Sequence, residues 1–336
     1  MLTSLRPLGT GTNDDDDELR RVAQTIPYLL TKSRADNTVK TYSQGFKTWK
    51  EWSARYKNVE SLPAHPYHVM LFIATLIQQS HSYSKIKNIF YAINWIHKIN
   101  NLLNPCKNNQ VRLMKEAAKR LVSRAKVKKL PIKPYHLLKI ARNNRNKKDL
   151  KKQRTITMIL LGYAGFLRFQ ELSTLTLGDL IFSEQYVKIF IQKSKCDQYR
   201  SGSWVFIAKR GNATCPVRAI KKYIKLAKVF KASEFIFRAL TYYKSTNSYQ
   251  LREKNQPLSY TSVREMILNE IENIGINKKF FGTHSLRAGG ATAAATFGVS
   301  DRLFKQHGRW SSDKAKDGYV ESDLKSLLFI SNNLGI

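Results

Sequence analysis

The sequence is short of acidic residues and cysteines, and it contains no long hydrophobic run. Asp and Glu number 24 against 58 Lys and Arg, so the 336-residue chain carries a formal net charge of +34. No stretch of 18 apolar residues occurs, which excludes a membrane-spanning helix, and the N-terminus lacks the apolar core of a signal peptide. The three cysteines, Cys106, Cys196 and Cys215, have neither metal-binding spacing nor an even count, which indicates reduced thiols in an intracellular protein.

Common nucleotide-binding and metalloprotease motifs are missing as well. The sequence has no Walker loop, no HExxH, no Gly-rich dinucleotide turn and no internal repeat. What remains is a strongly basic chain, which is typical of proteins that bind a polyanion, with DNA or RNA first and an anionic membrane second. Hydrophobic residues make up 42% of the chain, enough for a folded core, and the length suits two domains.

The N-terminal third has helical periodicity and no strand pattern. Residues 1–15 are polar and are expected to be disordered. Asp14 to Asp17 precede an apolar-periodic segment and favour a helix N-terminus there, although a solvated charge run explains them equally well. Further helices are expected near 37–52, 66–79, 83–99 and 110–126, and the first of these places Tyr42, Phe46, Trp49 and Trp52 on one face. These short helices predict a compact bundle over residues 16–129.

A basic segment follows the last helix of this predicted bundle. Pro131 and Pro134 interrupt helical structure and set the expected domain boundary near residue 130. The segment either lies along DNA phosphates or is merely a soluble charged linker, and the net charge favours phosphate contact. The residues expected to contact DNA are Lys119, Arg120, Arg124, Lys126, Lys128, Lys129 and Lys133.

Residues 130–320 combine helices with short strands. Helices are expected near 135–144, 150–166, 214–229 and 259–274. Two alternating runs, 185–192 and 203–208, predict a β-hairpin, 234–238 is expected to form a short strand, and 238–257 is expected to be a loop. The chain is therefore predicted to be mainly α with a small antiparallel β-sheet: a helical N-terminal domain followed by an α+β domain.

The stretch from Phe281 to Tyr319 holds the most informative residues. It opens with His284-x-x-Arg287, runs through small residues that predict a tightly packed helix, and ends with Trp310 and, nine residues later, Tyr319. A second group, Gly-Phe-Leu-Arg168 followed by Glu171, lies upstream. Taken singly, a surface ion pair, a satisfied histidine and a packed tyrosine account for these residues.

In this order the residues resemble the catalytic half of the tyrosine recombinases, the family of the phage integrases, the Xer proteins and Cre. The family pattern of Arg, hairpin Lys, His-x-x-Arg, His or Trp, and nucleophilic Tyr is matched by Arg168, Lys195, His284, Arg287, Trp310 and Tyr319. The resemblance covers residues 131–319, and the N-terminal bundle is similar to the family's core-binding domain in pattern only. Phe166 departs from the small residue that is usual at its position.

Two of these assignments have competitors in the sequence. Lys193 competes with Lys195, and the Ser-Lys-Cys context favours Lys195. His307 competes with Trp310, and the interval to Tyr319 favours Trp310.

The resemblance implies DNA strand exchange through a 3′-phosphotyrosyl intermediate. It implies that Arg168 and Arg287 bind the scissile phosphate and that Trp310 hydrogen-bonds it. It further implies that His284 accepts the proton of Tyr319 and that Lys195 protonates the leaving 5′-oxygen. Neither a metal nor a cofactor is expected, because the covalent link conserves the energy of the broken bond. The implied partners are double-stranded DNA and further copies of the chain, a dimer per site and a tetramer in synapsis.

Other functions and finer placements stay open on the sequence. A type IB topoisomerase-like enzyme nicks and reseals DNA with similar residues, and a domesticated DNA-binding protein would keep the charge without the catalysis. The Gly-Arg-Trp and Lys-Asp-Gly-Tyr segments look similar to recombinases of eukaryotic mobile elements, the DIRS-like elements and cryptons. The expected location is the nucleus in a eukaryote and the cytoplasmic nucleoid in a prokaryote.

The tail, residues 321–336, has apolar residues at helical spacing, namely Leu324, Leu327 and Leu328. So short a helix needs a groove to fill, either on its own domain or, as the resemblance implies, on a neighbouring subunit.

Overall fold

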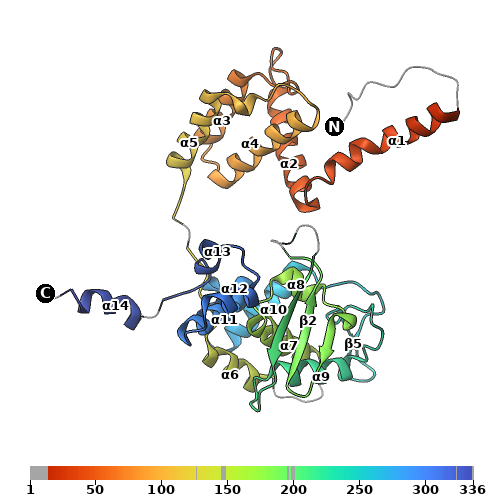
Figure 1. Cartoon of the computed structure of the whole chain (residues 1–336), viewed down its shortest axis with the longest axis vertical. Coiled ribbons are helices and arrows are strands. Elements are labelled where there is room, and N and C mark those ends of the chain that lie inside the picture. Colours follow the sequence, from red (N-terminus) through yellow and green to blue (C-terminus); the bar gives the residue numbers. More distant parts are fainter. Residues whose placement is uncertain are drawn as a thin grey trace. The chain divides into compact units, whose positions relative to one another are not determined.

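The structure is a computed structural model that describes residues 14–125, 127–144, 149–194, 197, 201–322 and 324–334 (Figure 1). The chain divides into two compact units, Met1–Lys126 and Val127–Ile336. The described residues are mainly helical with small antiparallel sheets, which confirms the predicted fold class. Among the described helices, none combines the length and the apolar character needed to cross a bilayer.

The first unit is a helical bundle. Its helices are α1 (Asp14–Thr31), α2 (Asp36–Ser53), α3 (Pro66–Gln78), α4 (Tyr83–Ile99) and α5 (Asn109–Val122), with a 3₁₀ turn at Pro105–Lys107. Helix α2 packs on α4, and α3 packs on α5. Trp49 is fully buried at the centre and donates its indole N–H to the Ser61 carbonyl at 2.9 Å. Side chains cap three of the helices at their N-termini, namely His65 at α3, Ser82 at α4 and Asn108 at α5.

Helix α1 begins at the acidic run, at Asp14, and includes residues predicted to be disordered. The rest of that prediction, residues 1–13, lies outside the described residues. Much of the apolar stripe of α1 is exposed, including Leu19, Val22 and Leu29.

The second unit is built around α7 (Leu150–Ala164), most of whose side chains are buried. Helices α9 (Pro216–Ala227) and α11 (His284–Thr296) pack against it. The remaining helices are α6 (Pro134–Asn143), α8 (Phe169–Ser173), α10 (Tyr260–Asn273), α12 (Asp301–Gly308), α13 (Asp313–Asp317) and α14 (Leu324–Asn332), with 3₁₀ turns at Leu177–Asp179 and Lys278–Phe280.

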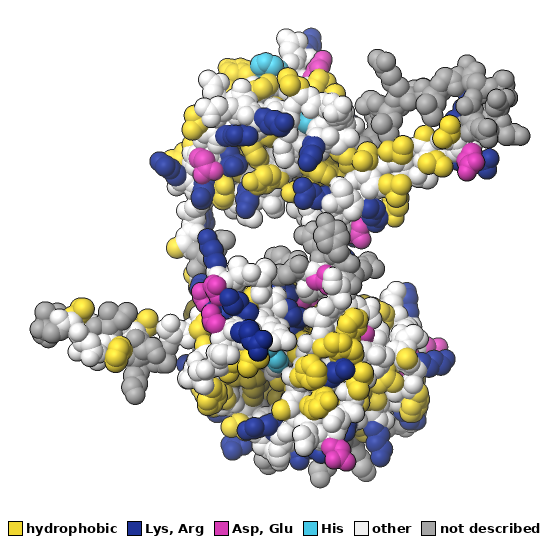
Figure 2. All heavy atoms as spheres, in the orientation of Figure 1, with side chains coloured by type: hydrophobic (Ala, Val, Ile, Leu, Met, Phe, Trp, Pro, Cys, Tyr) yellow, Lys and Arg dark blue, Asp and Glu magenta, His cyan; other side chains and the backbone are white. Residues whose placement is uncertain are grey.

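A three-stranded antiparallel sheet in the order β1-β2-β3 lies beside these helices: β1 (Leu180–Phe182), β2 (Tyr186–Ile191) and β3 (Ser203–Ala208). The predicted hairpin is β2–β3, in which Val187 pairs with Ile207 and both face the core. The alternate residues face outward, so that Trp204 and Phe206 stay exposed, and apolar side chains gather on this unit in Figure 2.

The prediction for residues 234–257 was wrong. The expected strand at 234–238 is reduced to one bridge between Thr176 and Phe235, because the chain there meets only the short connection between α8 and the 3₁₀ turn at Leu177–Asp179. The expected loop contains a second hairpin, β4 (Leu240–Tyr243) with β5 (Ser248–Leu251). The cross-strand pair Tyr242 and Tyr249, with ring centroids 5.1 Å apart, stabilises it, and polar turn residues hid this alternation in the sequence.

The segment before α6 is joined to the start of α11. The amide of Leu130 donates to the Phe280 carbonyl at 2.8 Å, and the amide of Ile132 donates to the Ser285 carbonyl at 2.9 Å. Ile132 is fully buried, and its carbonyl approaches Gly289 so closely that a Cβ there would lie 2.1 Å from the oxygen. The small residues of α11 therefore allow close packing in its first half.

Candidate active site

The loop after α7 turns sharply to present Arg168. Gly165 ends the helix, and Phe166 adopts a left-handed conformation with φ of +48°. Glu171 then caps the short helix α8 by accepting the backbone N–H of Arg168 at 2.9 Å. The same carboxylate accepts the Arg168 guanidinium at 2.7 Å, so Glu171 fixes both the backbone and the side chain of this arginine.

Glu171 is buried between two arginines. Its second partner is Arg309, whose Nη2 lies 2.8 Å from Oε2. Burial alone opposes ionisation of this carboxyl, but Arg309 and the contacts with Arg168 outweigh that effect and lower its pKa. Glu171 is therefore an ionised carboxylate shared by two guanidinium groups.

Arg287 lies one turn after His284 on α11, so both side chains share one face of the helix. It is fully buried, and its two terminal nitrogens donate to the carbonyls of Phe166 and Gly308. Burial first, and then the nearby charges of Arg168 and Arg309, lower the pKa of Arg287. Its Nε is buried and has no hydrogen-bond partner among the described residues.

Trp310 and Tyr319 lie against the Arg287 guanidinium. The guanidinium carbon is 4.4 Å from the Trp310 ring centre and 5.0 Å from that of Tyr319, which are cation–π distances. The indole N–H of Trp310 is buried and meets no acceptor within the described part of the chain. The hydroxyl of Tyr319 lies 3.5 Å from Nδ1 of His284, an exposed residue. The structure thus brings four of the predicted residues, His284, Arg287, Trp310 and Tyr319, into one cluster.

Two local contacts hold Tyr319 in this place. The Thr292 hydroxyl of α11 lies 3.5 Å from the Tyr319 carbonyl and accepts the Glu321 amide at 3.0 Å. Lys316 is buried among carboxylates, with Asp313 and Asp317 each at 3.4 Å and Asp301 closer, and this links α13 to α12.

Sequence reasoning missed Lys316 and Arg309. The Lys316 interaction had no signal beyond a mixed-charge run, whereas Arg309 lies in the conspicuous Gly-Arg-Trp segment.

The structure describes both residues of the Trp310 and His307 alternative, but only one residue of the Lys195 and Lys193 alternative. His307 donates its Nε2–H to the Ala164 carbonyl, outside the cluster, at 2.8 Å. Trp310, in contrast, packs on Tyr319 with ring centroids 5.6 Å apart. Burial lowers the pKa of His307. Lys195 lies outside the described residues, and Lys193 is exposed at the end of β2. The choice between the lysines therefore stays a prediction.

The predicted DNA-binding residues are surface residues where they are described. Lys119, Arg120 and Arg124 are exposed in or after α5, and Lys128, Lys129 and Lys133 are exposed before α6. Lys126 lies outside the described residues. The two sets belong to different compact units, and Figure 2 shows Lys and Arg outnumbering Asp and Glu on the visible surface of both.

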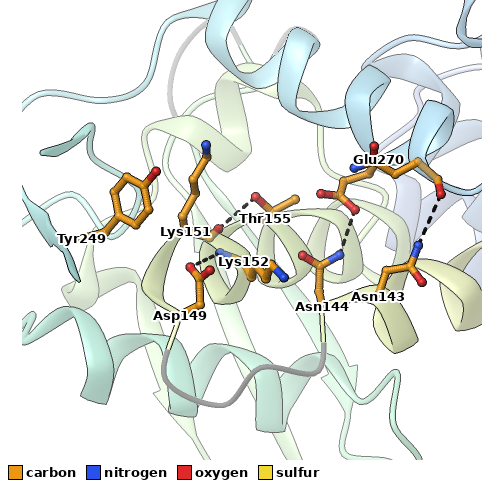
Figure 3. Close-up of a pocket in the computed structure, with 9 residues that line it drawn as sticks. Asn143, Asn144, Asp149, Lys151, Lys152, Thr155, Tyr249 and Glu270 are labelled. Atoms are coloured by element: carbon orange, nitrogen blue, oxygen red, sulfur yellow. Dashed lines mark hydrogen bonds between the residues drawn. The ribbon is translucent and has the colours of Figure 1, made fainter. Parts of the chain in front are cut away.

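A polar pocket of about 500 Å³ lies elsewhere in the second unit, between α6, α7, α10 and β5. Asn144 donates to Glu270 at 2.8 Å across it, and Lys151 and Tyr249 stand on its other side (Figure 3). Burial raises the pKa of Glu270. None of the predicted catalytic residues lines this pocket. Among the described residues, no group of three or more His, Cys, Asp or Glu side chains is placed to hold a metal ion.

Comparison with known proteins identifies the family of this chain. Residues 133–325 match the phage integrase family. An integrase/recombinase XerD homolog of Selenomonas ruminantium is 30% identical over 296 residues, which cover 87% of this chain and 83% of the relative. These comparisons lend no support to the expected eukaryotic mobile-element origin.

Solved structures share the fold. The XerH site-specific recombinase bound to a palindromic difH substrate has a TM-score of 0.60 at 14% identity, covering 99% of this chain and 92% of that chain. A lambda integrase dimer bound to a COC′ core site has a TM-score of 0.56 at 15% identity, covering 89% and 94%. The family match and the 30% identical relative together establish that the chain belongs to the phage integrase family and is a site-specific tyrosine recombinase.

Proposed function

We propose that Tyr319 is the nucleophile of this recombinase. Its oxygen attacks a DNA phosphorus, the P–O5′ bond breaks, and a 3′-phosphotyrosyl bond and a 5′-hydroxyl result. A free tyrosine has a pKa of about 10, so its proton needs an acceptor. The observation that carries the proposal is the 3.5 Å approach of the Tyr319 hydroxyl to His284 Nδ1, beside the positive charge of Arg287. The 5′-oxygen takes its proton from Lys195, or from Lys193 if that lysine is the one in place.

The phosphate binds against Arg168, Arg287 and Trp310. Two buried donors in this cluster, the Arg287 Nε–H and the Trp310 indole N–H, have no acceptor among the described residues. A buried donor without an acceptor costs about 1–3 kcal/mol, and a phosphate oxygen would remove that cost. Because Tyr319 covers the guanidinium, its ring has to shift as the phosphate enters. Charge building in the transition state is then offset by fixed guanidinium groups.

The substrate is double-stranded DNA, bound by more than one copy of the chain. Several of the similar solved structures are DNA complexes, including a lambda integrase dimer bound to a core site and a transposon integrase in complex with transposon right end DNA. We assign residues 16–129 as the core-binding domain and 130–320 as the catalytic domain. The seven basic residues predicted from the sequence, Lys119, Arg120, Arg124, Lys126, Lys128, Lys129 and Lys133, contact phosphates. The protein acts in the nucleus of a eukaryotic host or in the nucleoid of a prokaryotic one.

The tail joins subunits in this proposal. Helix α14 exposes Leu327, Leu328 and Phe329. An apolar groove of about 500 Å³ lies on the same unit between β3, α7, α11 and α12, and its lining includes Trp204 and Leu303. The groove of one copy receives α14 of the next, which couples neighbouring sites in a tetramer. Docking in cis is the alternative.

The nucleophile is tested by trapping the covalent intermediate. A duplex library with a randomised centre supplies the site, because adducts that resist detergent can be recovered and sequenced. A nicked duplex of that sequence then traps the intermediate, which shifts on a denaturing gel. We expect wild-type protein to form the adduct and Tyr319→Phe, which keeps the ring over Arg287, to form none. Adduct formation by Tyr319→Phe would overturn the assignment.

A further inference from the structure

Arg309 has a backbone conformation that an arginine adopts at a cost. It ends α12 with φ of +54° and ψ of +47°, in the left-handed region. A glycine reaches this conformation without steric penalty and is the usual residue where a helix ends in this way. The presence of arginine therefore calls for a compensating role of its side chain.

The side chain of Arg309 is almost wholly buried and donates to four acceptors among the described residues. Nη1 donates to the carbonyls of His307 at 2.8 Å and Gly165 at 3.2 Å, and Nη2 donates to the Phe166 carbonyl at 3.0 Å and to Glu171 at 2.8 Å. Its side chain is 5% exposed. A planar guanidinium can donate to all four acceptors at once, whereas a lysine ammonium at the same place cannot.

Two of these acceptors also hold the arginines of the proposed phosphate site. The Phe166 carbonyl accepts from Arg287 Nη1, and the Glu171 carboxylate accepts from Arg168 Nη1. Arg309 therefore hydrogen-bonds the Phe166 carbonyl, which holds Arg287, and the Glu171 carboxylate, which holds Arg168. Glu171 is thus shared between Arg309 and Arg168, at 2.8 Å and 2.7 Å.

We infer that Arg309 is a positioning residue, which fixes Arg168 and Arg287 through Glu171 and Phe166 and draws part of the Glu171 charge away from Arg168. Without Arg309, Glu171 pairs with Arg168 alone and competes with the phosphate for it. The inference rests on the proposed roles of Arg168 and Arg287, and it adds a residue that never touches DNA.

The first test compares cleavage and binding in Arg309→Gly. This change relieves the backbone, so a loss of rate cannot come from added strain. On the nicked duplex recovered above, we expect the first-order rate of adduct formation to fall by about 100-fold, the size of effect that misplaced catalytic groups produce. The dissociation constant for the duplex stays unchanged. Arg302→Ala, an exposed arginine on the same helix, is the matched control and keeps the wild-type rate.

The second test removes the competing charge. The double variant Arg309→Gly, Glu171→Gln retains an oxygen to cap α8 but no negative charge, so it should cleave faster than Arg309→Gly alone. A residue that only supported the fold would give no such recovery. Equal rates in the single and double variants, or a wild-type rate in Arg309→Gly, would overturn the inference.

A folding failure is covered by Arg309→Lys, which keeps the charge but loses the fork. Thermal melting checks the fold of each variant, and if Arg309→Gly does not fold, the lysine variant is measured in its place, with the same expected loss of rate at unchanged affinity. These outcomes are separate from those of the proposed function, because failure of wild-type protein to form any adduct would contradict the role of Tyr319 instead.

Discussion

Arg168 and Arg287 have the same proposed partner but very different surroundings. Arg168 keeps some exposure and is held by one carboxylate, whereas Arg287 is fully buried and satisfies two backbone carbonyls. Arg287 therefore also holds the loop after α7 against the end of α12.

This contrast gives a prediction for alanine variants. Arg168→Ala and Arg287→Ala should each slow adduct formation by about 100- to 1000-fold, the typical cost of losing one transition-state donor. The free energy of unfolding should fall more in Arg287→Ala, by about 1–3 kcal/mol, because the Gly308 carbonyl loses its donor in a buried place. Urea unfolding measures the second effect. Equal stability losses, or loss of binding in proportion to cleavage for both variants, would contradict these roles.

The sequence predicted the order of the site residues better than their contacts. His284 and Arg287 could be placed together because residues three positions apart on a helix share a face. The structure adds Trp310 and Tyr319 beside them. The partners of Glu171 could not be predicted in full, because Arg309 is far from it in sequence and the two meet only after α12 folds against the loop behind α7.

At the scale of elements, helices were predicted well and strands less so. Buried positions recurring every three or four residues mark α2, α3, α4 and α10, and a long apolar segment marks α7. Strand β1 has only three residues, too few for an alternation to be visible, and β4–β5 is a polar hairpin held by a tyrosine pair. Both depend on neighbours that the local sequence does not reveal.

The tail gives a prediction at this scale. A chain ended after Ser322 keeps Tyr319 and loses α14. If α14 docks on a neighbouring subunit, the shortened protein should bind a single site with normal affinity but fail to bring two sites together, since the groove between α11 and α12 stays empty. Native gels with one and two sites per duplex measure this. Full pairing of sites by the shortened protein would show that α14 does not join subunits, and loss of folding would indicate docking in cis.

At the scale of the whole molecule, the dominant property is the charge of +34. If the predicted DNA-binding residues of both units contact phosphates, the logarithm of the binding constant should fall with the logarithm of salt concentration, with a slope of about −0.9 per neutralised phosphate. We expect a steep slope that Arg124→Gln makes shallower by about one contact. Lys225→Gln, on the exposed side of α9, is the matched control and leaves the slope unchanged. A slope equivalent to one or two contacts would mean that the charge serves another purpose.

The hydrogen bonds that join Leu130 to the 3₁₀ turn before α11, and Ile132 to the first turn of α11, have a practical consequence for dissecting the chain. Ile132 fills the space over Gly289, so the segment belongs to the folded core of the second unit although the sequence suggests a free connector. A protease should cut readily ahead of this segment and poorly within it. A catalytic fragment that starts after Ile132 would leave α11, the helix that bears His284 and Arg287, uncovered at Gly289. A fragment that starts at Val127 would keep this part of the helix covered.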